Sequence, residues 1–177
     1  MKKNELFNIN VGDTFKVGGI ELIKFNQEGD KVTAVAKDTV FNSEFGNNNN
    51  FAESKILKRL EEEILPKIAD EIGMENIFDI TTDLTTLDGL KPYGEMTSKI
   101  SLPTFDFYRA NVAIFDKYKV KTWWWLATPD TAKPHYDPVW ITCVSPSGRI
   151  CNYSYYYFNG VRPILLFNSS IFVSCEE

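Results

Sequence analysis

Three consecutive tryptophans, Trp123, Trp124 and Trp125, constrain the fold of this chain more than any other sequence feature. Tryptophan favours strands, and successive side chains of a strand point to opposite faces of its sheet. The three rings therefore cannot share one face, and Trp124 must oppose the other two. We expect either Trp124 or the outer pair to lie in the core.

The triplet opens an aromatic segment that continues to residue 158. Polar and apolar residues alternate over 139–144 and 149–157 around a Ser-Pro-Ser-Gly turn, which predicts a β-hairpin. In the second strand the period of two places Tyr153, Tyr155 and Tyr157 on one face. Such a row suits both packing within a sheet and recognition of a partner.

The first half of the chain predicts strands followed by a helix. Apolar residues recur at spacings of three and four from Ile56 to Ile72, and charged residues occupy the other face, which is typical of an amphipathic helix. Asn50 is the expected N-cap, with Glu53 completing a capping box. Pro66 should kink or divide the helix, and a glycine, Gly73, should end it. A β-meander is expected before this helix, with strands over 14–17, 20–25 and 32–36 separated by glycine turns at 18–19 and 27–30.

The middle of the chain gives weaker signals. Residues 74–100 mix apolar residues with turn formers and predict loops with one or two strands. A second, short helix is expected to open at Pro103 or Thr104 and to continue through Phe115. The last two strands are expected over 161–167 and 171–175. Because no linker or repeat interrupts the chain, we expect a single α+β domain over residues 1–177.

Charge and hydropathy restrict the partners. The net charge is −5 and the isoelectric point is near 5.0, whereas proteins that neutralise phosphates present clustered Lys and Arg. Direct binding of nucleic acid is therefore not expected. The sequence has neither a run of about 18–20 apolar residues nor an apolar signal-peptide core. It predicts no membrane partner and a cytoplasmic or virion-associated location, and it leaves the oligomeric state open.

Three cysteines, Cys143, Cys151 and Cys175, form an odd set without a CxxC pair. Neither a disulfide framework nor a zinc site is suggested, and free buried thiols are the first expectation. Cys143 and Cys151 flank the predicted hairpin turn, so a link between them is the alternative.

The residues for catalysis are few. The chain has a single histidine, His135, in a proline-bracketed loop where Asp137 could orient it. No serine or cysteine is placed as a nucleophile. Scattered carboxylates and the absence of a phosphate-binding glycine loop predict no metal and no cofactor.

Several motifs of the chain belong together. They are Val11-Gly12-Asp13-Thr14, Gly18-Gly19-Ile20-Glu21, Glu53-Ser54-Lys55-Ile56-Leu57-Lys58-Arg59-Leu60, Trp124-Trp125-Leu126-Ala127-Thr128-Pro129, Gly148 and Gly160-Val161-Arg162-Pro163. Over most of its length the chain thereby resembles the bacterial and phage domain of unknown function 6273, which is associated with a C-type-lectin-like fold. The family usually carries Arg and Ser where this chain has Ala127 and Thr128, so any role of that arginine is absent.

The resemblance implies a small twisted antiparallel sheet, one long and one short helix, and a long irregular loop region that serves related proteins as a ligand surface. It does not imply an enzyme. The Glu-Pro-Asn and Trp-Asn-Asp motifs of calcium-binding lectins are missing from the sequence, so a calcium-dependent sugar site is not expected.

Together these features predict a non-catalytic binding protein, associated with a phage or prophage, that presents a Trp/Tyr-rich face to a protein or glycan. One alternative is a phage-encoded inhibitor that blocks a host defence nuclease, and another is an enzyme that uses His135 and Asp137. Arg162 suits a structural role, bonding loop carbonyls, as well as a ligand contact. The predicted binding residues are Trp123, Trp125, His135, Tyr136, Trp140, Arg149, Tyr153, Tyr155, Tyr157 and Arg162.

Overall fold

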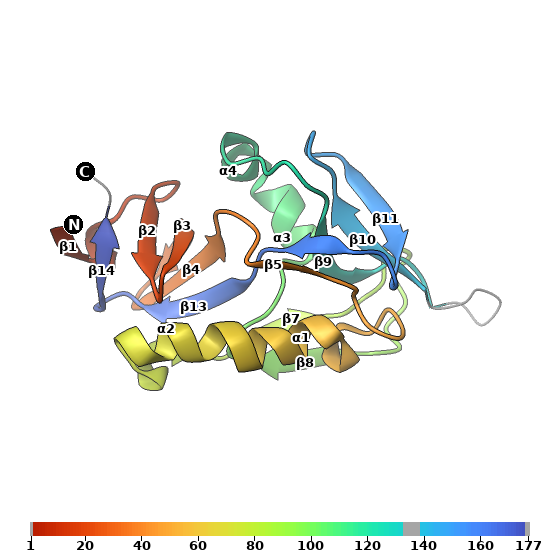
Figure 1. The fold of residues 1–177 in the computed structure, drawn as a ribbon, viewed down its shortest axis with the longest axis horizontal. Coiled ribbons are helices and arrows are strands. Elements are labelled where there is room, and N and C mark those ends of the chain that lie inside the picture. The colour runs from red at the N-terminus through yellow and green to blue at the C-terminus, as the bar shows by residue number, and fades with distance from the viewer. Residues whose placement is uncertain (1, 133–138, 176–177) are drawn as a thin grey trace.

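Two main β-sheets and a long helix beneath them form the frame of the protein, as the computed structural model shows for residues 2–132 and 139–175 (Figure 1). In the order of their pairing, the first sheet contains β1 (Lys2–Glu5), β14 (Phe172–Cys175), β2 (Thr14–Val17), β3 (Ile20–Glu28), β4 (Lys31–Ala36), β13 (Ile164–Asn168) and β6 (Ile77–Phe78). The second contains β11 (Ile150–Ser154), β10 (Trp140–Val144), β9 (Trp124–Pro129), β12 (Asn159–Val161) and β5 (Phe41–Ser43).

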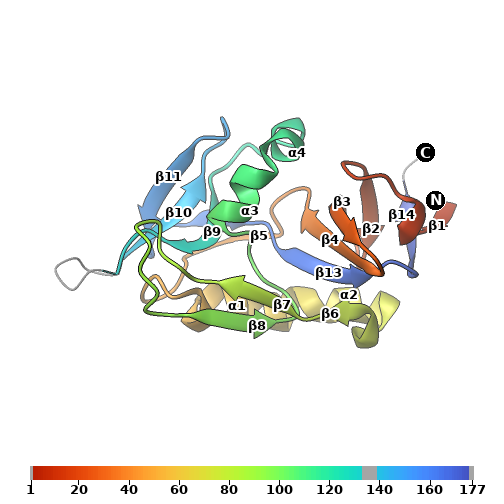
Figure 2. The same cartoon turned by 180° about the vertical axis from the view of Figure 1, so that it is seen from behind.

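A two-stranded ribbon of β7 (Ile80–Asp83) and β8 (Glu95–Ser98) completes the strands of the described residues. The view from behind shows this ribbon running alongside the long helix (Figure 2). Strands and helices thus mix in an α+β arrangement, as the sequence predicts. The sheets are larger than the small one expected, and β12 pairs with β9 in parallel rather than antiparallel.

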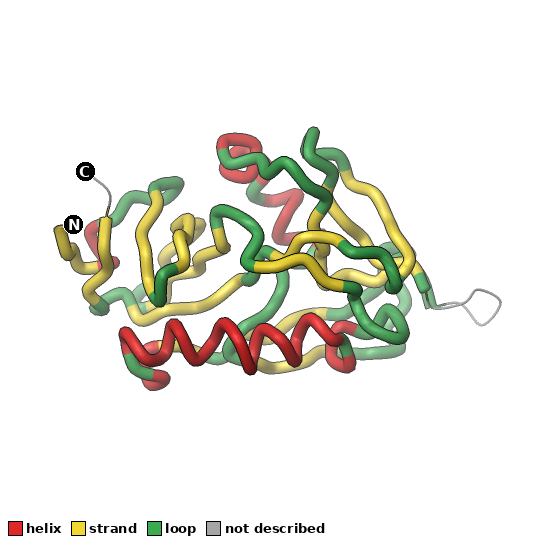
Figure 3. Tube along the Cα trace, in the orientation of Figure 1, coloured by secondary structure: helices red, strands yellow, loops and turns green. Residues whose placement is uncertain are grey.

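The long helix consists of α1 (Lys55–Arg59), a π-helical turn (Leu60–Ile64) and α2 (Leu65–Ile72), which form one continuous rod (Figure 3). Pro66 has no amide hydrogen to donate to the preceding turn, and the wider π turn lies directly before it. The proline therefore changes the local winding, where the sequence predicts a kink or a division. Gly73 ends α2 with a φ of 85°, as predicted.

The predicted start of the helix is wrong. Asn50 caps a separate 3-10 turn (Phe51–Glu53) through the amide of Ala52, and the Glu53 carboxylate accepts a hydrogen bond from Asn48 instead of returning to Asn50. The true N-cap is Ser54, whose hydroxyl accepts from the amide of Leu57 at 3.0 Å.

The helix packs closely on the first sheet at Gly18. A Cβ on this residue would lie 2.6 Å from the backbone carbonyl of Lys67, and the φ of 58° also favours glycine. The amide of Gly18 donates to the Glu71 carboxylate at 2.6 Å. Buried side chains of both sheets and of the helix, including Val17, Ile68 and Trp125, belong to one hydrophobic cluster.

The two sheets are joined by a short crossover near the C-terminus. The sequence predicts one strand over 161–167, but β12 ends at Val161 and β13 begins at Ile164 in the other sheet. Pro163 cannot donate to a strand ladder, which explains the break at this point. Arg162 and Pro163 therefore carry the chain from one sheet to the next.

Both faces of β9 are covered. Trp125 belongs to the hydrophobic cluster between the sheets and the long helix. Trp124 packs against Tyr108 of α3 (Phe105–Ala110) and Phe115 of α4 (Val112–Lys117). The short helix predicted to open near Thr104 exists, with Thr104 as its N-cap, but it is interrupted at Asn111. None of the helices in the described ranges is both long and apolar enough to cross a membrane.

Candidate functional site

A group of exposed aromatic rings lies where β11 passes into β12. We call Trp123, Tyr153, Tyr156, Tyr157 and Phe158 the aromatic surface. Its most exposed members are Phe158, Tyr156, Tyr157 and Trp123, at 69, 57, 48 and 41% of their full accessible area. Isolated exposed rings are common on proteins, but contiguous ones are typical of interaction sites.

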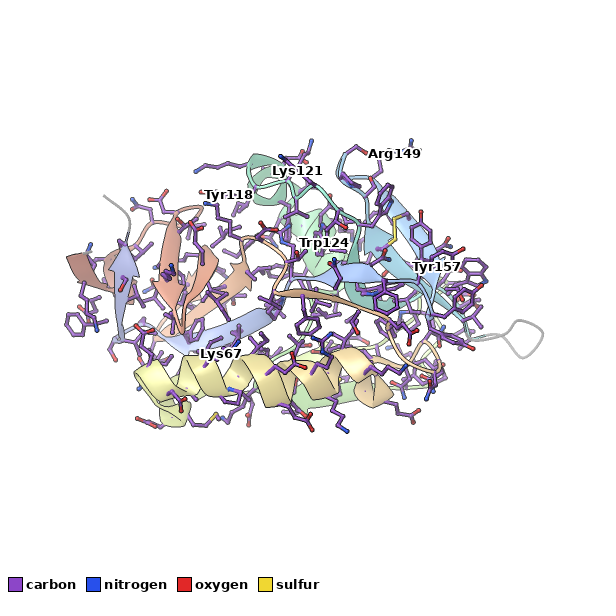
Figure 4. All side chains as sticks on the ribbon, in the orientation of Figure 1. Lys67, Tyr118, Lys121, Trp124, Arg149 and Tyr157 are labelled. Carbon is purple, nitrogen blue, oxygen red and sulfur yellow. A yellow bond between two sulfur atoms is a disulfide. The ribbon has the colours of Figure 1, made fainter. Side chains whose placement is uncertain are left out.

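Four of the five rings of the aromatic surface, all except Phe158, form a chain of contacts. Trp123 meets Tyr153 edge to face at a centroid distance of 6.5 Å, and Tyr153 lies 5.1 Å from Tyr157. Tyr157 stacks on Tyr156 at 5.2 Å with an interplanar angle of 25°. These contacts hold the rings against each other before any partner binds. Figure 4 shows Tyr157 at the outer edge of the molecule, beside β11.

A turn creates this arrangement. The sequence predicts a strand through Tyr157, but β11 ends at Ser154 and the next three residues turn, with the amide of Tyr157 donating to the carbonyl of Ser154 at 3.0 Å. The predicted alternation of Tyr153, Tyr155 and Tyr157 on one strand face is therefore wrong. Tyr155 is half-buried against the core, and the adjacent Tyr156 and Tyr157 lie side by side at the surface.

The turn is required because the chain must next enter the narrow space beside β9. Gly160 pairs with Trp124, and a Cβ on Gly160 would collide with the side chains of Thr39 and Thr122. A larger residue at this position would therefore force the Thr39 side chain to move.

The segment that carries most of the aromatic surface has no charge. Residues 150–161 contain no Asp, Glu, Lys or Arg. Arg149 precedes this segment as an exposed residue at the hairpin turn, and Figure 4 places it at the other end of β11 from Tyr157. Arg149 is therefore separate from the aromatic surface.

A disulfide fixes the hairpin beneath the rings. Cys143 of β10 and Cys151 of β11 are direct partners in the strand register, with a Cα–Cα distance of 5.1 Å, and their sulfurs are bonded. The expectation of free thiols at these two positions is wrong, and the alternative of a link across the turn is correct. Cys175 is a free cysteine.

The remaining predicted binding residues lie elsewhere. Trp125 is fully buried, and its indole Nε1 donates to the Ser43 carbonyl at 2.9 Å. Its proposed role in binding is therefore wrong, because the strand carries core on both faces. Trp140 is 43% exposed. Since Ile141 is the register partner of Tyr153, Trp140 points to the opposite face of the hairpin.

Arg162 has the structural role that the sequence suggests for it. The side chain is 1% exposed, Nε donates to the Ala36 carbonyl at 3.0 Å, and the guanidinium lies over Trp124 at 4.8 Å. Burial lowers the pKa of Arg162 to about 10, while the charge of Asp38 opposes this shift. A direct contact between Arg162 and a ligand on the aromatic surface is excluded.

His135, Tyr136 and Asp137 lie outside the described residues. Within residues 2–132 and 139–175 no group of three or more His, Cys, Asp or Glu side chains could hold a metal ion. Tyr156 and Phe158 were missed by the sequence prediction. No turn signal precedes them in the sequence, because the Asn-Gly pair after Phe158 lies in β12 and the turn itself is formed by three tyrosines.

No family model, curated protein or solved structure matches this chain in comparison. The resemblance to the domain of unknown function 6273 therefore stays a prediction from its motifs.

Proposed function

We propose that this protein is a non-catalytic binding protein that uses the aromatic surface to bind a partner protein. The observation that carries the proposal is the presence of three consecutive exposed rings, those of Tyr156, Tyr157 and Phe158, on a twelve-residue segment, 150–161, without a single charge. The centre of a protein interface is enriched in aromatic residues and depleted of charged ones.

The geometry of the rings favours tight binding. Tyr156 and Tyr157 are already stacked, and Tyr153 is held on a hairpin that the disulfide closes. A partner would therefore order few side chains on this surface. Immobilising a flexible side chain costs about 0.5–1.5 kcal/mol, so a surface that is already ordered keeps more of its contact energy. Tyrosine and tryptophan supply much of the binding energy at such sites.

A protein is a better match than a nucleic acid or a strongly basic partner. The acidic run of residues 61–63 on the long helix closely follows the basic residues Lys58 and Arg59, and Glu63 is paired with Arg59 at 2.8 Å. An inhibitor that mimics nucleic acid would need a continuous acidic surface, which this pairing does not favour. The aromatic surface instead suits an uncharged, apolar patch on the partner.

The finer fold assignment and the association with phages belong to the same proposal. The motifs that resemble the domain of unknown function 6273 support a C-type-lectin-like variant of the α+β fold. In that fold an irregular long-loop region serves related proteins as a ligand surface, and we propose the same use for the aromatic surface.

Paired variants test the proposal. The double variant Tyr157→Ala/Phe158→Ala removes two exposed rings, and Phe172→Ala removes an equally exposed ring from β14 in the other sheet. Immobilised wild-type protein and both variants are incubated with bacterial lysate, and retained proteins are identified by mass spectrometry. We expect wild type and Phe172→Ala to retain the same protein and the double variant to lose it, with melting temperatures within about 2 °C.

Two results would contradict this proposal. If the double variant retains the same protein as the wild type, the aromatic surface is not the binding site. If instead Trp140→Ala alone abolishes retention, the opposite face of the hairpin binds the partner. Retention on bacterial surface polysaccharide that only the double variant loses would identify a glycan as the partner.

A further inference from the structure

A groove with a volume of about 710 Å³ lies between two connections on the side of the molecule that carries α4. One wall is formed by residues 37–39, which link β4 to β5, and the other by residues 117–122, which link α4 to β9. Figure 4 shows Tyr118 and Lys121 on this side, and Tyr157 beside β11. The groove and the aromatic surface share no residue, although Thr122 of the groove directly precedes Trp123 in the chain.

Four lysines and two carboxylates line the groove: Lys37, Lys117, Lys119, Lys121, Glu21 and Asp38. Positive charge is thus in excess here, in a protein whose net charge is −5. The three lysines of the second wall alternate with Tyr118 and Val120, and all three are exposed, whereas Val120 is buried. Lys119 and Lys121 are therefore accessible to a ligand in the groove, whereas the Lys117 ammonium donates to the Gly12 carbonyl at 3.2 Å.

Two of the four groove lysines, Lys37 and Lys117, lie near the ring of Tyr118. The ammonium groups of Lys37 and Lys117 lie 5.9 and 5.1 Å from the centroid of the Tyr118 ring. The Tyr118 hydroxyl donates to the Gly12 carbonyl at 2.8 Å, which fixes the ring in place. Both positive charges therefore lie near one ring, and a bound anion in the groove would be attracted to them.

The carboxylates of the groove already have partners. Glu21 pairs with Lys37 at 2.8 Å. Asp38 accepts a hydrogen bond from the amide of Thr39 at 2.7 Å, and its charge acts on the buried Arg162. Lys119 is paired loosely with Asp116, at 3.5 Å between two half-exposed side chains. Such exposed pairs contribute little and exchange readily for a stronger anion.

Arg162 adds a second, independent indication. Its side chain is 99% buried by area, and its Nη2 has no hydrogen-bond acceptor among the described residues. Arg162 lines a small cavity together with Lys119 and Val120, and the latter two also line the groove. The positive charge of Arg162 is therefore buried next to the groove wall that contains Lys119 and Val120. Water screens this charge less than it screens the charges of the surface lysines.

We propose that this groove is a binding site for a phosphate-bearing polyanion. The ammonium groups of Lys37, Lys119 and Lys121 would contact its phosphate oxygens, and the hydroxyls of Thr39 and Thr122 would donate hydrogen bonds to them. Lysine binds phosphate as a point charge, and several lysines around one groove suit several linked phosphates. The buried Arg162 strengthens the attraction without touching the ligand.

The test uses tripolyphosphate as the probe and isothermal titration calorimetry at low ionic strength. The double variant Lys119→Gln/Lys121→Gln removes two charges from the groove, and Lys58→Gln/Lys67→Gln removes two exposed charges from the long helix. We expect wild type to bind, the groove variant to bind at least about tenfold more weakly, and the helix variant to change less than about twofold. Binding should also weaken with added salt.

Parallel titrations with ATP identify the source of the phosphates. Equal affinity for ATP and tripolyphosphate would assign the site to polyphosphate itself, whereas tighter binding of ATP would assign it to a nucleotide. No binding by wild type would overturn the proposal, as would an equal loss in the groove and helix variants. Either failure leaves the proposed function of the aromatic surface unaffected, because no groove lysine belongs to it.

Discussion

The aromatic residues of β9 and those of the β11–β12 turn have the same chemistry but opposite surroundings. Trp124 and Trp125 are sealed between two layers, with 2 and 0% of their area exposed. Tyr156, Tyr157 and Phe158 lie in the open on a turn of the same sheet. The difference shows that local sequence sets how many rings are present, while the position of a segment in the fold decides whether they are buried or exposed.

The largest effect is expected from Trp125→Ala. Removing this ring leaves a cavity beneath the long helix and an unpaired Ser43 carbonyl, so the free energy of unfolding should fall by about 3–5 kcal/mol. Trp123→Ala, two positions away, should cost less than about 1 kcal/mol because its ring is exposed. Urea unfolding of both variants checks this, and similar losses would erase the distinction between buried and exposed rings.

Removal of the disulfide should have the next largest effect. Cys143 lies in the same core cluster as Trp125, and Cys151 lies two residues before Tyr153, so the bond joins the two groups of rings. For a loop this short, the variant Cys143→Ala/Cys151→Ala should lose about 2–3 kcal/mol of unfolding free energy. Chemical denaturation of the variant, and of wild type with and without reductant, measures the loss. A stability that reductant leaves unchanged would show that the bond contributes nothing.

A smaller effect, dependent on pH, is expected at Tyr108, a buried tyrosine that packs on Trp124. Its hydroxyl donates to the Gly148 carbonyl at 2.6 Å, and Tyr108→Phe should cost about 1 kcal/mol near neutral pH. Burial, and secondarily the charge of Asp116, raise the pKa of Tyr108 above its ordinary value.

Because the folded pKa of Tyr108 is the higher one, its phenol stabilises the fold below about pH 10, and this contribution is lost as the pH rises through the folded pKa. The stability gap between wild type and Tyr108→Phe should therefore narrow above about pH 10. Denaturation curves at neutral and alkaline pH test this, and a gap that widens would reverse the sign of the pKa shift.

The smallest effect on stability is expected for Tyr156→Ala. This ring is 57% exposed and its main contact is stacking on Tyr157, so unfolding free energy should change by less than about 0.5 kcal/mol. Differential scanning calorimetry checks the value. A loss comparable with that of Trp125→Ala would place Tyr156 in the core and would remove the physical basis of the aromatic surface.

Local features of the fold could be predicted from the sequence. The apolar face of the long helix, its end at Gly73 and the start of a short helix near Thr104 each depend on residues within a few positions of one another. The hairpin of β10 and β11 was also predicted, because alternation and turn residues are adjacent in the chain. These signals are short-range, and the structure confirms them.

Features that depend on distant segments could not be predicted. Trp125 is covered by the long helix and by residues around Ser43, and no local pattern reveals that contact. The sequence analysis does not divide the predicted strand over 161–167, because alternation continues through it. Pro163, which cannot donate to a strand ladder, indicates the position of the break. The lysines of the groove come together only when residue 37 meets residues 117–121 in space.

The position of β11 at the rim of its sheet has a further consequence. One side of this strand is paired with β10, and among the described residues no strand pairs with the other. An uncharged edge strand can pair with a strand of another molecule and cause aggregation. Charged residues that flank an edge strand normally prevent this pairing. Arg149 and Arg162 flank the uncharged segment 150–161. Because Arg162 is buried, only Arg149 can oppose such pairing. Neutralising Arg149 should therefore lower solubility at high protein concentration, even though this residue supports neither the core nor the aromatic surface.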